Sequence, residues 1–243
     1  MRNLRDVFYI NSFPEKNEVV YYGLEFKEFL KLIPHEIDNI LILKGLSSND
    51  YSNKYLLQVA DKEGINRMIS ADPYNWGDFC WVDCKTIESV DSLTPSEVAE
   101  LLYLGHMLLP LNSAFFEKLQ NRYAYLAHDD GWFCRLYCRE FDEFGEIISN
   151  KIVRMATKTK RSKISQMNSE LERQLLSFAE DGLLIDFSDI EQDENGIGIH
   201  IFKIGKFLNM DDMYNNLERH KAKASYSATI VYKFYNKKWS IKL

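Results

Sequence analysis

The sequence predicts an α+β fold: a mainly antiparallel sheet with several packed helices, divisible into two modules. Three observations support this prediction. Short β-patterned and helical segments are interspersed without the regular alternation of a parallel α/β fold. Adjacent hairpins are frequent along the chain. Of the 243 residues, 46% are hydrophobic and 27% are charged, which is the composition of a globular protein with ample material for a core.

The N-terminal part of the chain is predicted to be rich in strands. The segment from Phe26 to Ile33 is the exception, because its apolar residues have helical spacing and Pro34 predicts that the helix ends near Leu32. The other segments are short, apolar and bounded by turn residues, which is typical of strands. In chain order they are DVFYIN, EVVYYGL, IDNILILKGL, KYLLQVAD, NRMISAD and WGDFCWVDC, with a turn at residues 13–17 between the first two.

The clearest predicted helix begins at Thr94. Thr94-Pro95-Ser96-Glu97 is a capping box with proline at the first helical position. One apolar stripe follows, and Pro110 ends the helix. The stripe consists of Val98, Leu101, Leu102, Gly105, Leu108 and Leu109. A second, short helix is predicted over Ser113–Gln120.

The strongest hairpin signal lies in the middle of the chain. YAYLAH and WFCRLYCRE flank Asp129-Asp130-Gly131, and Asp-Gly is typical of tight hairpin turns. A helix follows from Phe141 to Met155, and another from Ile164 to Phe178, which Gly182 closes. The tail is predicted to contain the strands LLIDFSDI and IGIHIFKIG, a helix N-capped by Asn209, and a last hairpin around Asn236-Lys237.

Charge is distributed unevenly. Residues 1–150 carry 14 Lys+Arg and 24 Asp+Glu, whereas residues 151–243 carry 16 and 12. This asymmetry predicts an acidic α+β domain at residues 1–157, a polar linker near residues 158–163 and a smaller basic α+β module at residues 164–243. An acidic first half also argues against a nucleic-acid partner, because phosphates require a basic surface.

Four cysteines occur as two C-x3-C pairs, Cys80 with Cys84 and Cys134 with Cys138. The pattern suggests zinc, but both pairs lie in strand-like stretches, where residues i and i+4 are about 13 Å apart. Two thiolates at that separation cannot ligate one tetrahedral metal. We therefore expect four reduced, largely buried thiols and no metal site.

The chain lacks the standard motifs of nucleotide-binding proteins, serine hydrolases and zinc proteases. Gly196-Ile197-Gly198 is interpreted as a turn entering a strand. His128, Asp129 and Asp130 form the best candidate for chemistry, because a histidine beside two acids can bind a divalent metal. Together with His106 they define one hypothesis, a metal-assisted hydrolase. The other interpretation is that the two aspartates form an ordinary hairpin turn.

A second candidate feature is an acidic aromatic surface. Aromatic and acidic residues alternate before and along one predicted strand, and the hairpin tip adds more of both kinds. Such a surface can bind a basic partner protein, a sugar or a cationic ligand. Ordinary sheet packing with surface acids is the alternative interpretation. The predicted binding residues are Trp76, Asp78, Trp81, Asp83, His128, Asp129, Asp130 and Trp132.

The block YAYLAHDDGWFCRLYCREFDEFGEIISNKI resembles the closing part of the SUKH superfamily of bacterial immunity and adaptor proteins. The shared features are a strand, an acidic turn, another strand and a helix opened by F-x-x-F, here Phe141 and Phe144. GDFCWVD is similar to the preceding strand of that family, so the resemblance spans residues 77–152. More generally, the chain resembles uncharacterised cytoplasmic proteins of Gram-positive bacteria. The resemblance implies partner binding and supplies no catalytic residues.

Together these patterns favour a cytoplasmic bacterial protein that binds another protein through an acidic aromatic surface, as an immunity or regulatory adaptor protein does. No catalytic residue, cofactor or metal is predicted for this function. The partner is expected to be basic, because an acidic face steers a basic protein toward it. A nucleic-acid partner is not expected, and no apolar run is long enough for a membrane span.

Overall fold

The computed structural model describes residues 6–43, 57–71, 78–128, 133–160, 163–207 and 209–243. These residues form an α+β fold with antiparallel strand pairing, as predicted. The chain divides into two compact units. Unit 1 contains Met1–Glu15, Val19–Pro34 and Asp142–Leu243, and unit 2 contains Lys16–Glu18 and His35–Phe141. Unit 2 is therefore largely an insertion between two parts of unit 1.

Unit 1 is built on six strands in the order β11-β10-β9-β8-β1-β2. Their bounds are β1 Val7–Phe13, β2 Glu18–Tyr22, β8 Leu183–Gln192, β9 Gly196–Lys203, β10 Tyr226–Lys233 and β11 Lys238–Lys242. A 3-10 turn, η2 (Pro14–Lys16), connects β1 to β2. The helices of this unit are α1 Phe26–Phe29, α5 Glu143–Lys160, α6 Ser169–Ala179, α7 Met210–Asn215 and α8 Leu217–Ala222.

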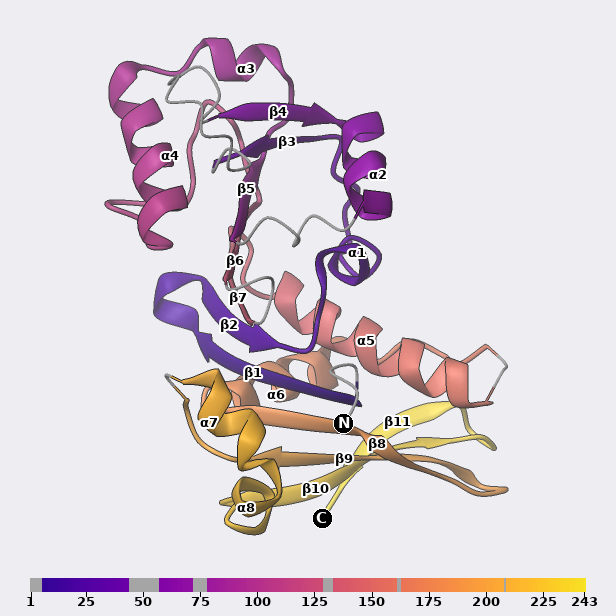
Figure 1. The fold of residues 1–243 in the computed structure, drawn as a ribbon. Coiled ribbons are helices and arrows are strands. Elements are labelled where there is room, and N and C mark those ends of the chain that lie inside the picture. The colour runs from indigo at the N-terminus through magenta and orange to yellow at the C-terminus, as the bar shows by residue number, and fades with distance from the viewer. Residues whose placement is uncertain (1–5, 44–56, 72–77, 129–132, 161–162, 208) are drawn as a thin grey trace. The chain divides into compact units, whose positions relative to one another are not determined.

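Helices cover both faces of the unit 1 sheet (Figure 1). The side chains of neighbouring strand residues point to opposite faces, which assigns each helix to a side. Asp186 of β8 binds Lys221 of α8, whereas the next residue, Phe187, lies under Lys151 of α5. The α7–α8 pair therefore lies on one face, and α5, which packs on α6, lies on the other.

Unit 2 contains five strands in the order β7-β6-β5-β3-β4. Their bounds are β3 Asn39–Ile42, β4 Gln58–Asp61, β5 Phe79–Asp83, β6 Tyr123–His128 and β7 Phe133–Cys138. Its helices are α2 Lys62–Ala71, α3 Glu88–Asp91 and α4 Pro95–Met107. The buried side of α4 and one face of β3, β5 and β6 form a shared core that includes Leu101, Leu104, Cys80 and Val82.

Several sequence predictions are confirmed at the level of single residues. Thr94 and Glu97 form the expected reciprocal capping box at the start of α4. Asn209 caps α7, since its side chain accepts hydrogen bonds from the backbone N–H groups of Asp211 and Asp212. Gly182 follows α6 with a positive φ of 77°. The hairpins β1–β2, β6–β7 and β10–β11 all form where they were predicted.

Two predicted elements are wrong. The segment NRMISAD was predicted to be a strand, but it belongs to helix α2, which buries Ile65 and half-buries Met68 and Ile69 at helical spacing. Residues 113–120 were predicted to be helical but form turns. The buried side chain of Asn121 bonds the Phe116 N–H and the Ala114 carbonyl, so these groups are paired outside a helix. The helix at Phe26 is also shorter than predicted, because α-helical geometry ends at Phe29.

The compact units do not follow the boundary expected near residues 158–163, which lies inside unit 1. Helix α5 continues through Lys158 to Lys160 and packs on α6, which follows the expected linker. The two compact units nevertheless differ in net charge. Unit 2 carries 10 basic and 17 acidic residues, a net charge of −7, whereas unit 1 carries 20 and 19.

Candidate functional site

The strand β5 was expected to carry part of an acidic aromatic surface, but its side chains are buried. Trp81 has no exposed surface and stacks on Tyr125 of β6, with ring centroids 5.1 Å apart and planes within 8°. Phe79 is 4% exposed and meets the same tyrosine edge to face. On the opposite face, Cys80 and Val82 belong to the α4 core. The structure therefore buries Trp81, which was predicted to lie on an exposed binding surface.

Asp83, at the end of β5, is also buried, with 9% of its surface exposed. Its carboxylate accepts hydrogen bonds from the backbone N–H groups of Arg122 at 3.0 Å and Tyr123 at 2.6 Å. Burial raises the pKa of Asp83 to about 6, against the opposing effects of these two bonds and of the Arg122 charge. Asp83 thus fixes the start of β6 and is not part of an exposed binding surface.

This burial makes folding depend on pH. Below pH 3.8, the ordinary pKa of the group, Asp83 is protonated in both the folded and unfolded states. As the pH rises, the unfolded chain loses the proton first, and above a pH of about 6 the folded protein must hold a buried charge. This group therefore stabilises the fold most at low pH, and its contribution decreases by up to about 3 kcal/mol between pH 4 and pH 7.

We expect Asp83→Asn to remove that dependence while keeping an oxygen that accepts the two N–H bonds. The free energy of unfolding, measured with urea at pH 4.5 and pH 7.5, should fall less with pH in the variant than in the wild type. An identical pH dependence in both proteins would show that Asp83 titrates normally.

The other predicted binding residues are only partly described. His128 is half-buried at the end of β6 and stacks on Phe133, with ring centroids 4.3 Å apart. Asp78 is half-buried directly before β5. Trp76, Asp129, Asp130 and Trp132 lie outside the described residues. The hypothesis of a hydrolase that uses His106, His128, Asp129 and Asp130 is untested, and the described part of the chain contains no group of three potential metal ligands.

All four cysteines are buried and form no disulfide, which confirms the predicted burial. Burial and the neighbouring Asp83 charge raise the pKa of the Cys84 thiol to about 11. Because the thiolate is the reactive form, this thiol is protected at neutral pH. We expect an aromatic disulfide reagent at pH 8 to modify the four cysteines quickly only after unfolding in denaturant. Rapid modification of Cys84 in the native protein would contradict this expectation.

Exposed apolar side chains occur on helix α4, in contrast to β5, whose side chains are buried. Tyr103 and Met107, one helical turn apart, are 39% and 49% exposed. Leu109 and Leu111 directly follow the helix and are 44% and 59% exposed. We name these four residues the α4 patch. Sequence reasoning did not identify it, because Leu109 was assigned to the apolar stripe of the helix and the other three residues were not singled out.

Packing and the end of α4 explain why this patch faces outward. Gly105 lets the helix touch β3, since a Cβ at this position would lie 2.7 Å from the Leu43 Cβ. This contact directs Leu101, Leu104 and Gly105 inward, and residues on the other side of the helix face solvent. Leu108 then adopts a left-handed conformation with φ of 58°, which ends the helix before the last two patch residues.

Acidic residues accompany the patch along the same helix and the one before it. They are Glu88 and Asp91 of α3 and Glu97 and Glu100 of α4. Glu97 also pairs with Lys118 at 2.7 Å, and that bond and the capping bonds with Thr94 lower its pKa to about 2. The carboxylate therefore stays charged across the physiological pH range. Unit 2 thus combines exposed apolar side chains with a surplus of negative charge.

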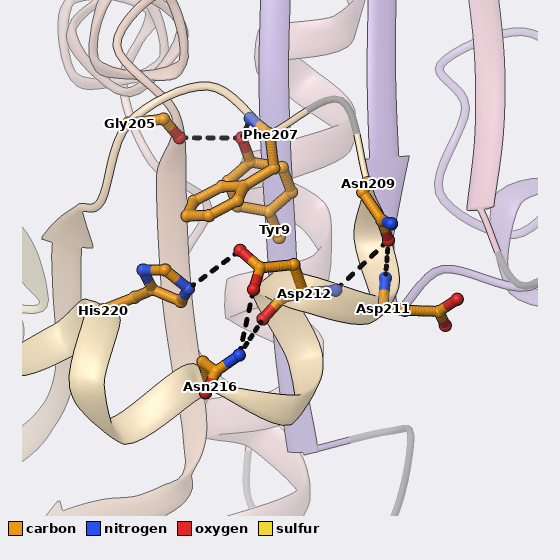
Figure 2. A network of polar contacts seen from close by, with 8 residues as sticks. All are labelled: Tyr9, Gly205, Phe207, Asn209, Asp211, Asp212, Asn216 and His220. Atoms are coloured by element: carbon orange, nitrogen blue, oxygen red, sulfur yellow. Dashed lines mark hydrogen bonds and ion pairs between the residues drawn. The ribbon is translucent and has the colours of Figure 1, made fainter.

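A separate polar network lies in unit 1, where α7 and α8 meet β1 (Figure 2). The buried Tyr9 hydroxyl donates to the Gly205 carbonyl at 2.8 Å and accepts from the Phe207 N–H at 3.0 Å. His220 packs against the Phe207 ring, and its Nε2 lies 3.5 Å from an Asp212 carboxylate oxygen. Burial raises the pKa of Tyr9 well above its usual value. These contacts connect Gly205 and Phe207 to β1, and α7 to α8.

Comparison with known proteins gives no relative of this chain: no family model, no curated protein and no solved structure matches it. The resemblance to the SUKH superfamily therefore stays a prediction. Among the described residues, no helix has the length and apolar character needed to cross a membrane.

Proposed function

We propose that this chain is a non-enzymatic protein-binding protein, of an immunity-like or regulatory kind, and that the α4 patch of unit 2 is its contact surface. The observation that carries the proposal is the grouping of Tyr103, Met107, Leu109 and Leu111, each at least 39% exposed, at one end of a helix. Contiguous exposed apolar side chains mark interaction sites, whereas isolated ones need no explanation.

The net charge of unit 2 indicates the chemistry of the partner. Four acids along α3 and α4, in a unit of net charge −7, would attract a basic protein and favour fast association. Tyrosine and methionine are enriched in interface centres, where their removal is costly. The proposed partner therefore has an apolar anchor that contacts Tyr103 and Met107, surrounded by lysine or arginine.

The test compares the wild type with Tyr103→Ser/Met107→Ser, and with Val59→Ser as a matched control. Val59 is also an exposed apolar residue of unit 2, at 38%, but lies on β4. The wild type is used to isolate a stoichiometric partner from a lysate of the source cells, and the dissociation constant is then measured with purified proteins. We expect the double variant to bind at least tenfold more weakly, because hot-spot truncations cost roughly 2 kcal/mol each.

Measurements of salt dependence, thermal stability and sedimentation distinguish the outcomes of this test. Binding by the wild type should weaken between 50 and 300 mM salt, as expected for an acidic surface with a basic partner. All three proteins should remain folded at the assay temperature in a thermal melt, since Tyr103 and Met107 lie outside the α4 core. Unchanged affinity in the double variant would refute the proposal. Sedimentation that shows a wild-type dimer, dissociated by the double substitution, would assign the patch to self-association instead.

A further inference from the structure

One end of the unit 1 sheet contains a groove that has no part in the proposed function. It lies where the β8–β9 and β10–β11 turns come together, a region visible in Figure 1 at the tips of these two hairpins. The backbone N–H of Phe234 donates to the Asn195 carbonyl and ties the two turns to each other. The groove encloses about 370 Å³, which is within the usual range of small-molecule sites.

The floor of this groove contains two glycines of β9, and Gly198 is the one whose missing side chain faces the groove. Gly196 and Gly198 pair with Lys233 and Val231 of β10 and share their face of the sheet. A Cβ at Gly198 would lie 3.1 Å from the Thr229 methyl group and 3.2 Å from the Glu191 Oε2. The G-x-G sequence was interpreted as a turn entering a strand, and β9 does begin at Gly196. The absent side chain at Gly198 also lowers the sheet surface at this point, whereas at Gly196 a Cβ would meet the Tyr232 carbonyl oxygen at 2.3 Å.

One wall of the groove holds a carboxylate in a fixed position. Thr229 Oγ1 lies 3.3 Å from His200 Nδ1, and His200 Nε2 lies 3.2 Å from Glu191 Oε1. This chain of contacts crosses from β10 through β9 to β8. It engages one oxygen of Glu191 and leaves the other, Oε2, above the glycine floor. The wall therefore presents negative charge to the groove.

The opposite side of the groove is basic. Lys233 of β10 and Lys242 of β11 line it. The backbone bonds from Asn195 and Gly196 lower the pKa of Asp193 on the acidic side, and the charge of Lys242 adds to that effect. Asp193 itself is engaged by the turn, since its Oδ1 accepts the N–H bonds of Asn195 and Gly196 at 2.8 Å each. Three inter-strand spacings of roughly 4.8 Å separate β8 from β11, so their backbones are about 14 Å apart. The side chains of the two strands extend across part of this distance.

We propose that this groove binds a small zwitterion, a free α-amino acid or a dipeptide, with its ammonium group at Glu191 and its carboxylate at Lys242. A ligand with a positive and a negative end matches the two sides of the groove in one orientation. The side chain of the ligand would extend over Gly198 and Val231. Free amino acids and dipeptides share this chemistry and differ in length, so the test includes both.

The experiment is a thermal-shift screen of the full chain against the twenty amino acids and the twenty glycyl dipeptides at 10 mM, followed by calorimetry on the best ligand. We expect at least one of the two groups to contain a ligand that binds. Its N-acetylated form and its C-terminal amide should each bind at least tenfold more weakly, because each lacks one charge. Glu191→Gln and Lys242→Gln should each weaken binding of the unmodified ligand by a similar factor.

Matched controls are Glu194→Gln and Lys237→Gln, which remove the same charges from the neighbouring turns without lining the groove. Both control variants should bind the ligand with the affinity of the wild type. Gly198→Ala, which places a methyl group on the floor, should weaken binding while the protein keeps its circular dichroism spectrum. The proposal is overturned if no member of the panel binds, or if binding persists equally in Glu191→Gln, Lys242→Gln and the controls.

Discussion

Glu28→Ala should lower the free energy of unfolding by about 3–5 kcal/mol, the usual cost of leaving one member of a buried ion pair alone. Glu28 of α1 accepts a hydrogen bond from the ammonium group of Lys151, which is 1% exposed in α5. The Phe187 ring lies 5.9 Å from the same ammonium. Removal of the carboxylate would leave the Lys151 ammonium buried inside unit 1. Among the described residues, no other carboxylate forms an ion pair with it, so a new counter-ion would require side chains to move.

The pH dependence of this variant has a defined sign. Burial already lowers the pKa of Lys151, and Glu28 opposes that effect. Without Glu28 the pKa should fall further, so the folded protein releases a proton that the unfolded chain retains up to the ordinary value of 10.5. Stability of Glu28→Ala should therefore rise with pH over this range, since the unfolded state binds more protons.

A double variant separates the cost of the lone charge from the cost of lost packing. In Glu28→Leu/Lys151→Met both charges are absent, and apolar pairs of similar volume often replace buried ion pairs with little loss. We expect it to be more stable than Glu28→Ala in urea unfolding at pH 7. A loss below about 1 kcal/mol in Glu28→Ala would show that solvent or loss of the Lys151 proton relieves the lone ammonium, since the nearby Arg154 carries the same charge and only disfavours it.

Gly182→Ala should be the second severe substitution, with a loss of about 4 kcal/mol or more and a fall of roughly 8–16 °C in melting temperature. Gly182 follows α6 with φ of 77°, which alone costs an L-residue about 1–2 kcal/mol. An added Cβ would also lie 1.9 Å from the Gly205 carbonyl oxygen. That oxygen is held in place by the Tyr9 hydroxyl, so the two segments cannot separate freely.

Gly205→Ala is the matched control for the close contact. Gly205 has a similar φ of 91°, but nothing lies within 4 Å of an added Cβ. This variant should show only the conformational cost, and differential scanning calorimetry should place its melting temperature between those of the wild type and Gly182→Ala. Equal destabilisation of the two variants would mean that backbone strain, and not the clash, decides the effect.

The sequence predicted elements whose signals are local. The capping box at Thr94, the cap at Asn209 and the glycine at residue 182 each satisfy or end a helix through groups within a few residues. The β6–β7 strands follow from alternating apolar residues on either side of a turn motif. The α2 helix was mistaken for a strand because its apolar residues are few, and short apolar segments fit either period.

The residue pattern within one element could not predict which of its side chains are buried by other elements. Alternation along β5 separates Phe79 and Trp81 from Cys80 and Val82, but it does not say that both sets are buried. The same limit applies to α4, where the predicted apolar stripe includes Leu109, which follows the helix and is exposed. The groove at Gly198 also depends on strand neighbours far apart in the chain, since Glu191, Gly198 and Val231 become adjacent only through pairing.

Sequence patterns were therefore sufficient to predict the α+β class, the antiparallel hairpins, the helix caps and the burial of the four cysteines. These properties depend on residue type and on spacing within one element. The tertiary structure decided that Asp83 and Trp81 are interior, that Tyr103 and Met107 are exposed, and that unit 2 is an insertion in unit 1. The physical reason is that burial depends on which elements pack together, and strand order and helix placement bring together residues distant in the chain.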